Sequence, residues 1–175
     1  MAMDPGEFRR LVDQHQRMVF SIALRIVRDH GTAEEVAQDV FLELFRSADR
    51  LQGEDHIRYW LRRVAVHRAT DALRRHARQP EACAEMWMEE QHGFASPASG
   101  LGNSVSHRLE SMVGTLPEAM RVAVVLRYGE DLSADEIAQV LGQPPATVKS
   151  NLQRGLKLLR QKAAVTMKEY VRERA

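Results

Sequence analysis

The chain has 175 residues, 44% of them hydrophobic, and a formal net charge of +1. No apolar run approaches the roughly 18–20 residues that span a bilayer, and the N-terminus lacks a signal-peptide pattern, so we expect a cytoplasmic protein without membrane insertion. The single cysteine, Cys83, excludes an internal disulfide, and the seven scattered histidines lack ligand spacing, so no metal site and no cofactor are predicted.

The first 50 residues predict two amphipathic helices. Apolar residues recur every three or four positions over residues 7–29, which indicates a helix with one buried face. Thr32 and Glu35 have the spacing of a capping box, so we expect a second helix to begin there. The apolar positions of this second helix are Val36, Val40, Phe41, Leu44 and Phe45.

A third helix is predicted after the break at Gly53, from Ile57 to about Arg78. Its stretch from Arg58 onward contains seven arginines and one acid, Asp71. A cationic helix of this kind favours a polyanionic partner, although the charge alone is equally consistent with a solvated helix face. The residues expected to face the core are Ile57, Trp60, Leu61 and Val64.

Residues 79–105 have the composition of a tether, with prolines, glycines and serines spread along them. This stretch is also acidic, because residues 79–115 contain five glutamates and one arginine. The apolar island of residues 86–88 is interpreted as a short turn of helix resting on a neighbour.

Two shorter helices are predicted next. Leu116 and Pro117 begin a helix that ends at Gly129, and Ser133 with Glu136 forms a second capping box. That capping box opens a helix that stops at Gly142, and its apolar residues are Ile137, Ala138, Val140 and Leu141.

The last helix is strongly basic and follows two prolines. Pro145 in its first turn has no N–H to leave unpaired, so the prolines fix where the helix starts. From Lys149 to Lys168 there are six basic residues and no acid. Two helices joined by a tight glycine-containing turn form a helix-turn-helix, so we expect this helix to bind DNA.

The start of the basic helix offers the best-placed candidates for DNA contacts. A helix N-terminus carries a positive dipole and unpaired N–H groups suited to phosphate, and Thr147, Lys149 and Ser150 lie there. Arg154 and Lys157 are expected to meet the DNA backbone further along. Charge alone leaves open that these residues form a solvated face.

These motifs, in this order, resemble the extracytoplasmic-function sigma factors of the sigma-70 family. The resemblance covers most of the chain outside the tether. Region 2.2 is matched by Ala33–Phe41, and regions 2.3 and 2.4 are matched by Trp60–Ala65 and Asp71–Arg75. Region 4 is matched by Leu116–Glu118, Val124–Gly142, Thr147–Ser150 and Leu152–Arg154.

The resemblance implies a subunit of bacterial RNA polymerase that directs initiation and is not an enzyme. Its partners would be the clamp and flap of core polymerase, promoter DNA and an anti-sigma factor. The implied fold is all-α. It consists of a three- to four-helix region 2 domain (1–78), a flexible linker (79–106) and a region 4 helix-turn-helix domain (107–175).

In region 4, the second helix of the helix-turn-helix reads the −35 element. Asn151 stands where the family often has arginine, and base contact, backbone contact and plain exposure all remain open for it. Gly155 replaces a frequent alanine at a cost of about 1 kcal/mol in helix propensity, for no reason visible in the sequence. The implied −35 residues are Pro145, Thr147, Lys149, Ser150, Asn151, Arg154 and Lys157.

Regions 2.3 and 2.4 recognise and melt the −10 element, and the loop at residues 51–56 corresponds to the one that captures a flipped base. A single strand requires cations along its backbone and aromatic faces for its bases. Trp60 lies on the apolar stripe and is assigned to the core. The stretch 66–68 departs from the common Arg-Asn-Leu, which leaves the −10 preference open. The implied −10 residues are Tyr59, Arg63, His67, Thr70, Arg74 and Arg75.

Region 2.2 binds the polymerase clamp, and Gln38, Asp39 and Glu43 occupy the matching positions. An acidic, solvated helix face is the alternative interpretation of these three residues. The linker of the family threads the active-site cleft and RNA exit path, so its glutamates are either mimics of RNA phosphate or part of a plain spacer.

A stand-alone helix-turn-helix regulator, with an N-terminal partner or ligand domain, is the alternative function. Such a regulator has no need of the motif around Gln38 and Asp39 or of the arginine-rich helix that follows. A hydrolase or transferase is not supported, because the sequence pairs no nucleophile with a base and contains no phosphate-cradling glycine loop.

Overall fold

The computed structural model describes residues 4–47, 51, 53–78 and 100–173, with side chains except at 100–106 and 167–173. All regular structure in these residues is helical, which confirms the all-α prediction. None of the described helices is long and apolar enough to cross a bilayer. The chain divides into two compact units, the first comprising residues up to 90 and the second most of the remainder.

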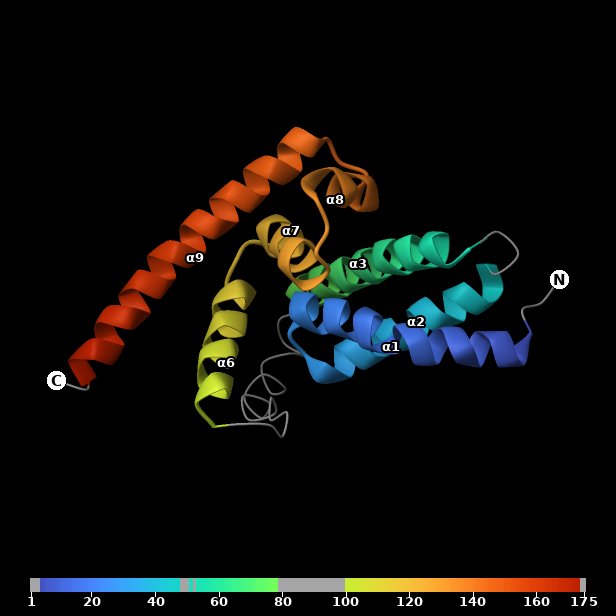
Figure 1. Cartoon of the computed structure of the whole chain (residues 1–175), viewed down its shortest axis with the longest axis horizontal. Helices are drawn as coiled ribbons and strands as arrows, with labels where there is room; N and C mark the ends of the chain where they lie inside the picture. The colour runs from blue at the N-terminus through green and yellow to red at the C-terminus, as the bar shows by residue number, and fades with distance from the viewer. Residues whose placement is uncertain (1–3, 48–50, 52, 79–99, 174–175) are drawn as a thin grey trace. The chain divides into compact units, whose positions relative to one another are not determined.

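Three helices form the first unit: α1 (Pro5–Val27), α2 (His30–Ser47) and α3 (Glu54–Arg78). Each packs against the other two (Figure 1). Complete burial of one aliphatic side chain contributes about 1.5–3 kcal/mol, so the shared core stabilises all three helices together. The core residues that are at most 1% exposed include Leu11, Val19, Ile22, Ile26, Val40, Leu44 and Leu61.

Helix α2 begins two residues earlier than the sequence predicted. It starts at His30, and the Oδ2 atom of Asp29 accepts a hydrogen bond of 2.6 Å from the backbone N–H of Thr32. The predicted capping box of Thr32 and Glu35 is therefore wrong. Thr32 is buried inside the first turn, and Asp29, which is as good an N-cap as threonine, caps the helix instead.

Three residues that the sequence assigned to the core lie at its edge or outside it. Trp60 and Val64 on α3 are partly exposed, and Phe45 on α2 is 41% exposed. The buried stripe of α3 runs along a neighbouring line of positions, where alanines allow the helices to approach closely. This stripe consists of Ile57, Leu61, Ala65, Val66, Ala69 and Ala72.

The described part of the second unit contains α6 (Gly100–Gly114), α7 (Glu118–Gly129), α8 (Ala134–Leu141) and α9 (Pro145–Glu173). Helix α7 packs along α9, and α6 contacts both (Figure 1). The interior of this unit is again aliphatic, and its buried residues include Leu116, Val122, Leu126, Ile137 and Val148.

The capping box predicted at the start of α8 is confirmed. The Ser133 N–H donates to Glu136 Oε2 at 2.8 Å, and the Glu136 N–H donates to Ser133 Oγ at 3.2 Å. Each side chain thus satisfies a backbone donor that the helix itself leaves unpaired. The starts of α8 and α9 therefore follow from short sequence signals.

Helix α6 differs from the prediction, because it begins at Gly100 inside the segment interpreted as a tether. Leu101, Val105, Leu109 and Met112 recur every three or four residues, but the neighbouring glycines and serines obscure that helical pattern. The domain boundaries drawn from the sequence stay a prediction. The acidic segment and the apolar island of residues 86–88 lie outside the described residues.

Candidate nucleic-acid interface

A tight turn joins α8 to α9. Gly142 adopts a left-handed φ of +62°, its N–H donates to Gln139 O at 3.3 Å, and the N–H of Gln143 donates to Ala138 O at 3.0 Å. These bonds close α8 as a Schellman motif. Pro145 then opens α9, where a missing N–H costs nothing. The two helices and this turn form the predicted helix-turn-helix.

One face of α9 gathers most of the residues predicted to contact the −35 element. Their spacing of three or four positions places them in one stripe. Val148 and Gly155, on the adjacent side of the helix, are buried, whereas no member of the stripe is buried. Its members, all wholly or partly exposed, are Thr147, Ser150, Asn151, Arg154 and Lys157.

Lys149 does not belong to this stripe. It follows Thr147 by two residues, which is about 200° around the helix. Its Nζ lies 3.9 Å from Asp135 Oδ1 on α8, and the two side chains are 60% and 71% exposed. A pair this exposed is worth about 0–1 kcal/mol. A phosphate could therefore displace Asp135 at little cost. Pro145, also exposed, marks the start of the helix.

On α3, five of the six predicted −10 residues share one face opposite the buried stripe. Their intervals of four, four, three and four residues place them along one side of the helix. Arg75 follows Arg74 directly in the sequence, which is about 100° around the helix, so it lies outside this stripe. It is exposed near the end of the helix. The −10 stripe consists of Tyr59, Arg63, His67, Thr70 and Arg74.

The hydroxyl of Thr70, one member of the −10 stripe, is engaged within its own helix. Its hydroxyl lies 2.9 Å from Val66 O and 3.0 Å from His67 O, so its proton is directed back to the helix. The hydroxyl oxygen can therefore accept a hydrogen bond from a nucleotide but has no free proton to donate.

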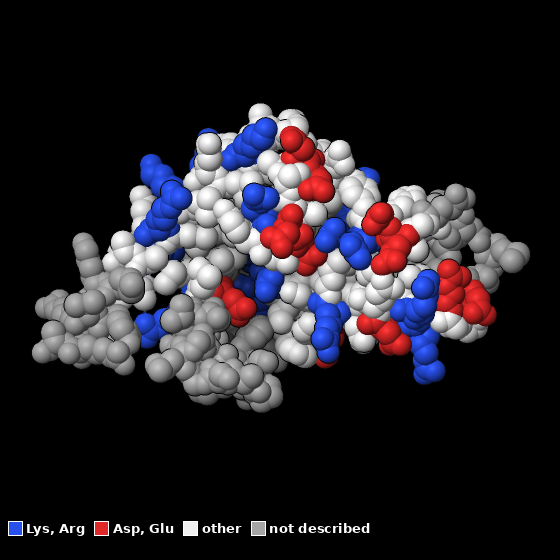
Figure 2. Space-filling view, viewed as in Figure 1, with Lys and Arg blue, Asp and Glu red and all other residues white. Residues whose placement is uncertain are grey.

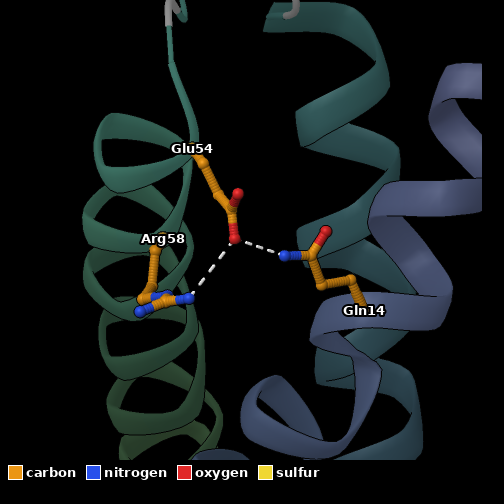
Figure 3. A network of polar contacts seen from close by, with 3 residues as sticks. All are labelled: Gln14, Glu54 and Arg58. Carbon is orange, nitrogen blue, oxygen red and sulfur yellow. Dashed lines mark hydrogen bonds and ion pairs between the residues drawn. The ribbon is translucent and has the colours of Figure 1, made fainter.

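Polar contacts fix the first turn of α3 against α1. Gln14 Nε2 donates to Glu54 Oε1, and Arg58 Nη2 lies 3.4 Å from the same oxygen (Figure 3). Next to Gln14, His15 is buried. Burial and the positive charge of Arg58 lower the pKa of His15, so its imidazole is neutral at pH 7. The helix begins at Glu54, three residues earlier than predicted, so this anchored turn includes the second half of the loop 51–56 that was predicted to capture a flipped base.

The exposed face of α2 carries Gln38 and Asp39, as the sequence predicted for a polymerase contact. It also carries two apolar residues that sequence reasoning did not assign to a site. Leu42 is 51% exposed and Phe45 is 41% exposed, with the Phe45 ring 5.2 Å from that of Phe8. Intervals of four and three residues place Gln38, Leu42 and Phe45 on one face of the helix, and this spacing could have identified the surface. The hydrophobicity of Phe45 instead led to its assignment to the core.

Glu43, the third residue predicted to contact polymerase, is engaged within the protein. Its Oε2 lies 2.7 Å from Arg68 Nη2 on α3. The −35 stripe, by contrast, belongs to a helix whose charged residues from Pro145 to Thr166 are all cationic, visible as blue side chains along α9 (Figure 2). The described residues contain no group of three or more potential metal ligands.

The sequence matches two protein-family descriptions. "Sigma-70 region 2" matches residues 11–79, which include most of α1 and all of α2 and α3. "Sigma-70, region 4" matches residues 106–159, which include α7, α8 and the first half of α9.

Several relatives match along most of their length. The RNA polymerase sigma-H factor of Pseudomonas aeruginosa is 30% identical over 158 residues, which cover 85% of this chain and 82% of the relative. The ECF RNA polymerase sigma-E factor of Escherichia coli is 31% identical with the same coverage. The ECF RNA polymerase sigma factor SigK of a Mycobacterium species is 30% identical, covering 90% of this chain and 83% of the relative.

Solved structures share the fold at lower identity. CnrH, in complex with the cytosolic domain of CnrY, aligns with a TM-score of 0.66 and 20% identity, covering 93% of this chain and 90% of that chain. The sigma factor RpoE of Bartonella quintana, in complex with the anti-sigma factor NepR, aligns with a TM-score of 0.69 and 17% identity, covering 91% and 98%.

Proposed function

The chain belongs to the extracytoplasmic-function sigma factors of the sigma-70 family, and from that premise we propose that it binds core RNA polymerase and directs initiation at specific promoters. One observation carries the proposal. Separate exposed stripes on α3 and α9 lie in the units that match region 2 and region 4, and both stripes combine cations with polar side chains.

The α9 stripe is proposed to read the −35 element. Thr147, Ser150 and Asn151 are near the N-terminus of a helix that follows a tight turn, where short polar side chains reach base edges in a major groove. Arg154 and Lys157, further along the same face, would neutralise backbone phosphates. Lys149 is proposed to join them by exchanging Asp135 for a phosphate, and Pro145 fixes where the helix begins.

The α3 stripe is proposed to hold the opened −10 strand. Arg63 and Arg74 supply cations along the backbone, and Tyr59 supplies an aromatic face on which an unstacked base can rest. His67 and Thr70 lie between these cations on the same face, where His67 can accept or donate a hydrogen bond and the Thr70 hydroxyl oxygen can accept one. Arg75 adds a further cation near the end of α3.

The exposed face of α2 is proposed to contact core polymerase. Gln38 and Asp39 are exposed there, next to Leu42 and Phe45. Exposed apolar residues surrounded by polar ones mark protein–protein interfaces, so the two apolar residues support this surface and extend it. Glu43 borders this surface, although its carboxylate already accepts hydrogen bonds from α3.

Regulation by an anti-sigma factor is part of the proposal. The RpoE relative is bound to the anti-sigma factor NepR, and CnrH is bound to the cytosolic domain of CnrY. As a polymerase subunit, the chain would act in the cytoplasm and have no catalytic activity of its own. Residues 1–78 and 107–175 are proposed as its two domains, joined by the linker at 79–106.

Run-off transcription with purified chain and core polymerase tests the proposal. Genomic DNA serves as template, and sequencing of the products maps their start sites. We expect discrete starts that require both the chain and core polymerase. Binding to duplex DNA without any core-dependent transcript would instead identify a stand-alone regulator. Asp39→Ala should reduce affinity for core polymerase, whereas Glu34→Ala, an exposed acid outside the predicted contact set, should not.

A further inference from the structure

Arg68 is positioned between the two functional faces of the first unit. It follows His67 of the −10 stripe directly, yet it projects toward α2 rather than into the stripe. Its partner there is Glu43, four residues after Asp39 on the helix proposed to bind polymerase. One residue pair therefore links the promoter-facing helix to the polymerase-facing helix.

The contact has better geometry than an ordinary surface ion pair. Arg68 donates from Nη2 at 2.7 Å and from Nε at 3.2 Å to the same Glu43 oxygen. The side chains are 47% and 36% exposed. The pair of Arg58 and Glu54, in contrast, is 3.4 Å long and lies within one helix. Two donors from a planar guanidinium restrict orientation as well as distance.

The surrounding charges also favour this position for Arg68. The hydrogen bonds that Arg68 donates to Glu43 raise the pKa of Arg68, and the negative charges of Glu43, Asp39 and Asp71 act in the same direction. Arg68 is thus the cation of a small acidic group that spans α2 and α3.

The hydrophobic packing leaves this half of α3 in need of such a constraint. Beyond Leu61, its buried stripe contains mainly the alanines Ala65, Ala69 and Ala72. Alanine side chains allow close approach but bury less apolar area than leucine or isoleucine, so this half of the helix has less packing energy to hold its register. His67, Thr70 and Arg74 project from this same half, so their placement depends on the register of the helix.

We infer that Arg68 is a positioning residue that sets the register of the promoter-facing helix on the polymerase-facing helix by holding Glu43. The inference rests on the proposed function. Glu43 then serves as an anchor within the protein rather than as a ligand of polymerase. Gln38, Asp39, Leu42 and Phe45 remain as the polymerase-facing set.

The test compares Arg68→Ala, Glu43→Ala and the double variant in complete holoenzyme. Core affinity is measured by fluorescence anisotropy, and promoter opening by permanganate reactivity of −10 thymines. A half-exposed pair predicts a loss of about two- to fivefold in opening for each single variant, with core affinity within about twofold of wild type. The double variant should be no worse than either single, because the two residues act as one unit.

Two further variants separate positioning from simple loss of stability. Arg68→Lys keeps the charge but cannot donate in the same fork, so it should recover only part of the opening. Exchanging the residues, with Glu43→Arg and Arg68→Glu together, should recover most of it. Thermal melting identifies any variant that fails to fold. If Arg68→Ala is unfolded, promoter opening by Arg68→Lys is compared with that by wild type instead.

Two results would overturn the inference. Weaker core binding in Glu43→Ala but not in Arg68→Ala would make Glu43 a polymerase ligand, as its sequence position suggested. Wild-type opening in Arg68→Ala would remove its positioning role. Neither result would contradict the proposed function. That proposal would be wrong if the wild-type holoenzyme opened no promoter.

Discussion

His15 is a buried histidine in the core between α1 and α3. It is 3% exposed, and its Nε2 has no hydrogen-bond partner among the described residues. Burial, then the charge of Arg58, lowers its pKa, while Glu54 acts in the opposite direction and Arg62 adds to the lowering. The folded protein therefore binds this proton less readily than the unfolded chain.

This lowered pKa predicts a pH-dependent stability. The contribution of neutral His15 is present above pH 6.5, the ordinary value for the unfolded chain, and is lost as the pH falls toward the lower folded value. The free energy of unfolding should fall by at most about 1.4 kcal/mol per pH unit in this window. Urea titrations at several pH values measure it. His15→Leu should remove the contribution of His15 to the slope of unfolding free energy against pH. An unchanged slope would show that His15 is not its source.

Gly142 shows a purely conformational requirement. Its φ is +62°, and no atom lies within 4 Å of the position a Cβ would occupy. Gly142→Ala should therefore destabilise the second unit by about 1–2 kcal/mol through backbone strain alone. Gly142→Asn should cost less, because asparagine tolerates the left-handed region. Thermal melts of both variants check this order, and equal costs would point to a steric cause instead.

At the scale of elements, the structure explains why α9 has a glycine within its helical run. Gly155 is buried against α7, where an added Cβ would lie 3.2 Å from Val124 Cγ2 and 3.4 Å from Met120 Cβ. The sequence showed only the propensity cost of about 1 kcal/mol. Packing of α7 along α9 supplies the reason, since a bare backbone lets the two helices approach closely.

This close approach predicts different outcomes for two substitutions. In Gly155→Ala, the gain in helix propensity of about 1 kcal/mol opposes a contact a few tenths of an ångström too short, so the net change should stay within about 1 kcal/mol. Gly155→Val should destabilise by about 1–3 kcal/mol through overpacking. Chemical denaturation distinguishes them. Equal stability of the valine variant would show that α7 and α9 separate without cost.

Helix order and most boundaries could be predicted from the sequence, because amphipathic spacing and caps are local signals. The Ser133 capping box and the proline start of α9 are confirmed in this way. The start of α2 was mistaken, since two adequate caps, Asp29 and Thr32, stand close together. Helix α6 was missed because glycines lower helix propensity without preventing a helix that packs on α7 and α9.

At the scale of the whole molecule, the proposed function requires two cationic stripes in separate units to act on one promoter. A domain that binds DNA through phosphates loses affinity steeply with salt. The salt dependence of holoenzyme–promoter binding therefore counts the cations that contact DNA, and α9 offers matched residues for such a count.

Arg154→Ala should weaken promoter binding and lower the slope of log affinity against log salt by about 0.9, the value for one lost phosphate contact. Arg160→Ala is the matched control, because it removes an exposed cation of the same helix that was not predicted to contact the −35 element. It should leave the slope nearly unchanged. Filter binding of holoenzyme at several salt concentrations measures both. Equal effects would mean that the net charge of α9, not its stripe, determines affinity.

Asp135→Asn should have the opposite effect on affinity. Removing this carboxylate frees Lys149 from its partner at 3.9 Å, so promoter binding should tighten by about two- to fivefold. The same variant in a Lys149→Ala background should show no gain. A gain that persists without Lys149 would attribute the effect to general repulsion between Asp135 and DNA.

The sequence by itself determined the described helices other than α6, the helix-turn-helix, the two cationic stripes and the family, because each depends on residues close together in the chain. The tertiary structure alone decided which charges are paired: Glu43 with Arg68, and Lys149 with Asp135. It also decided that Phe45 is exposed and that Gly155 is a packing contact. The physical reason is that the period of one helix fixes which residues share a face, whereas only its neighbours fix what that face meets.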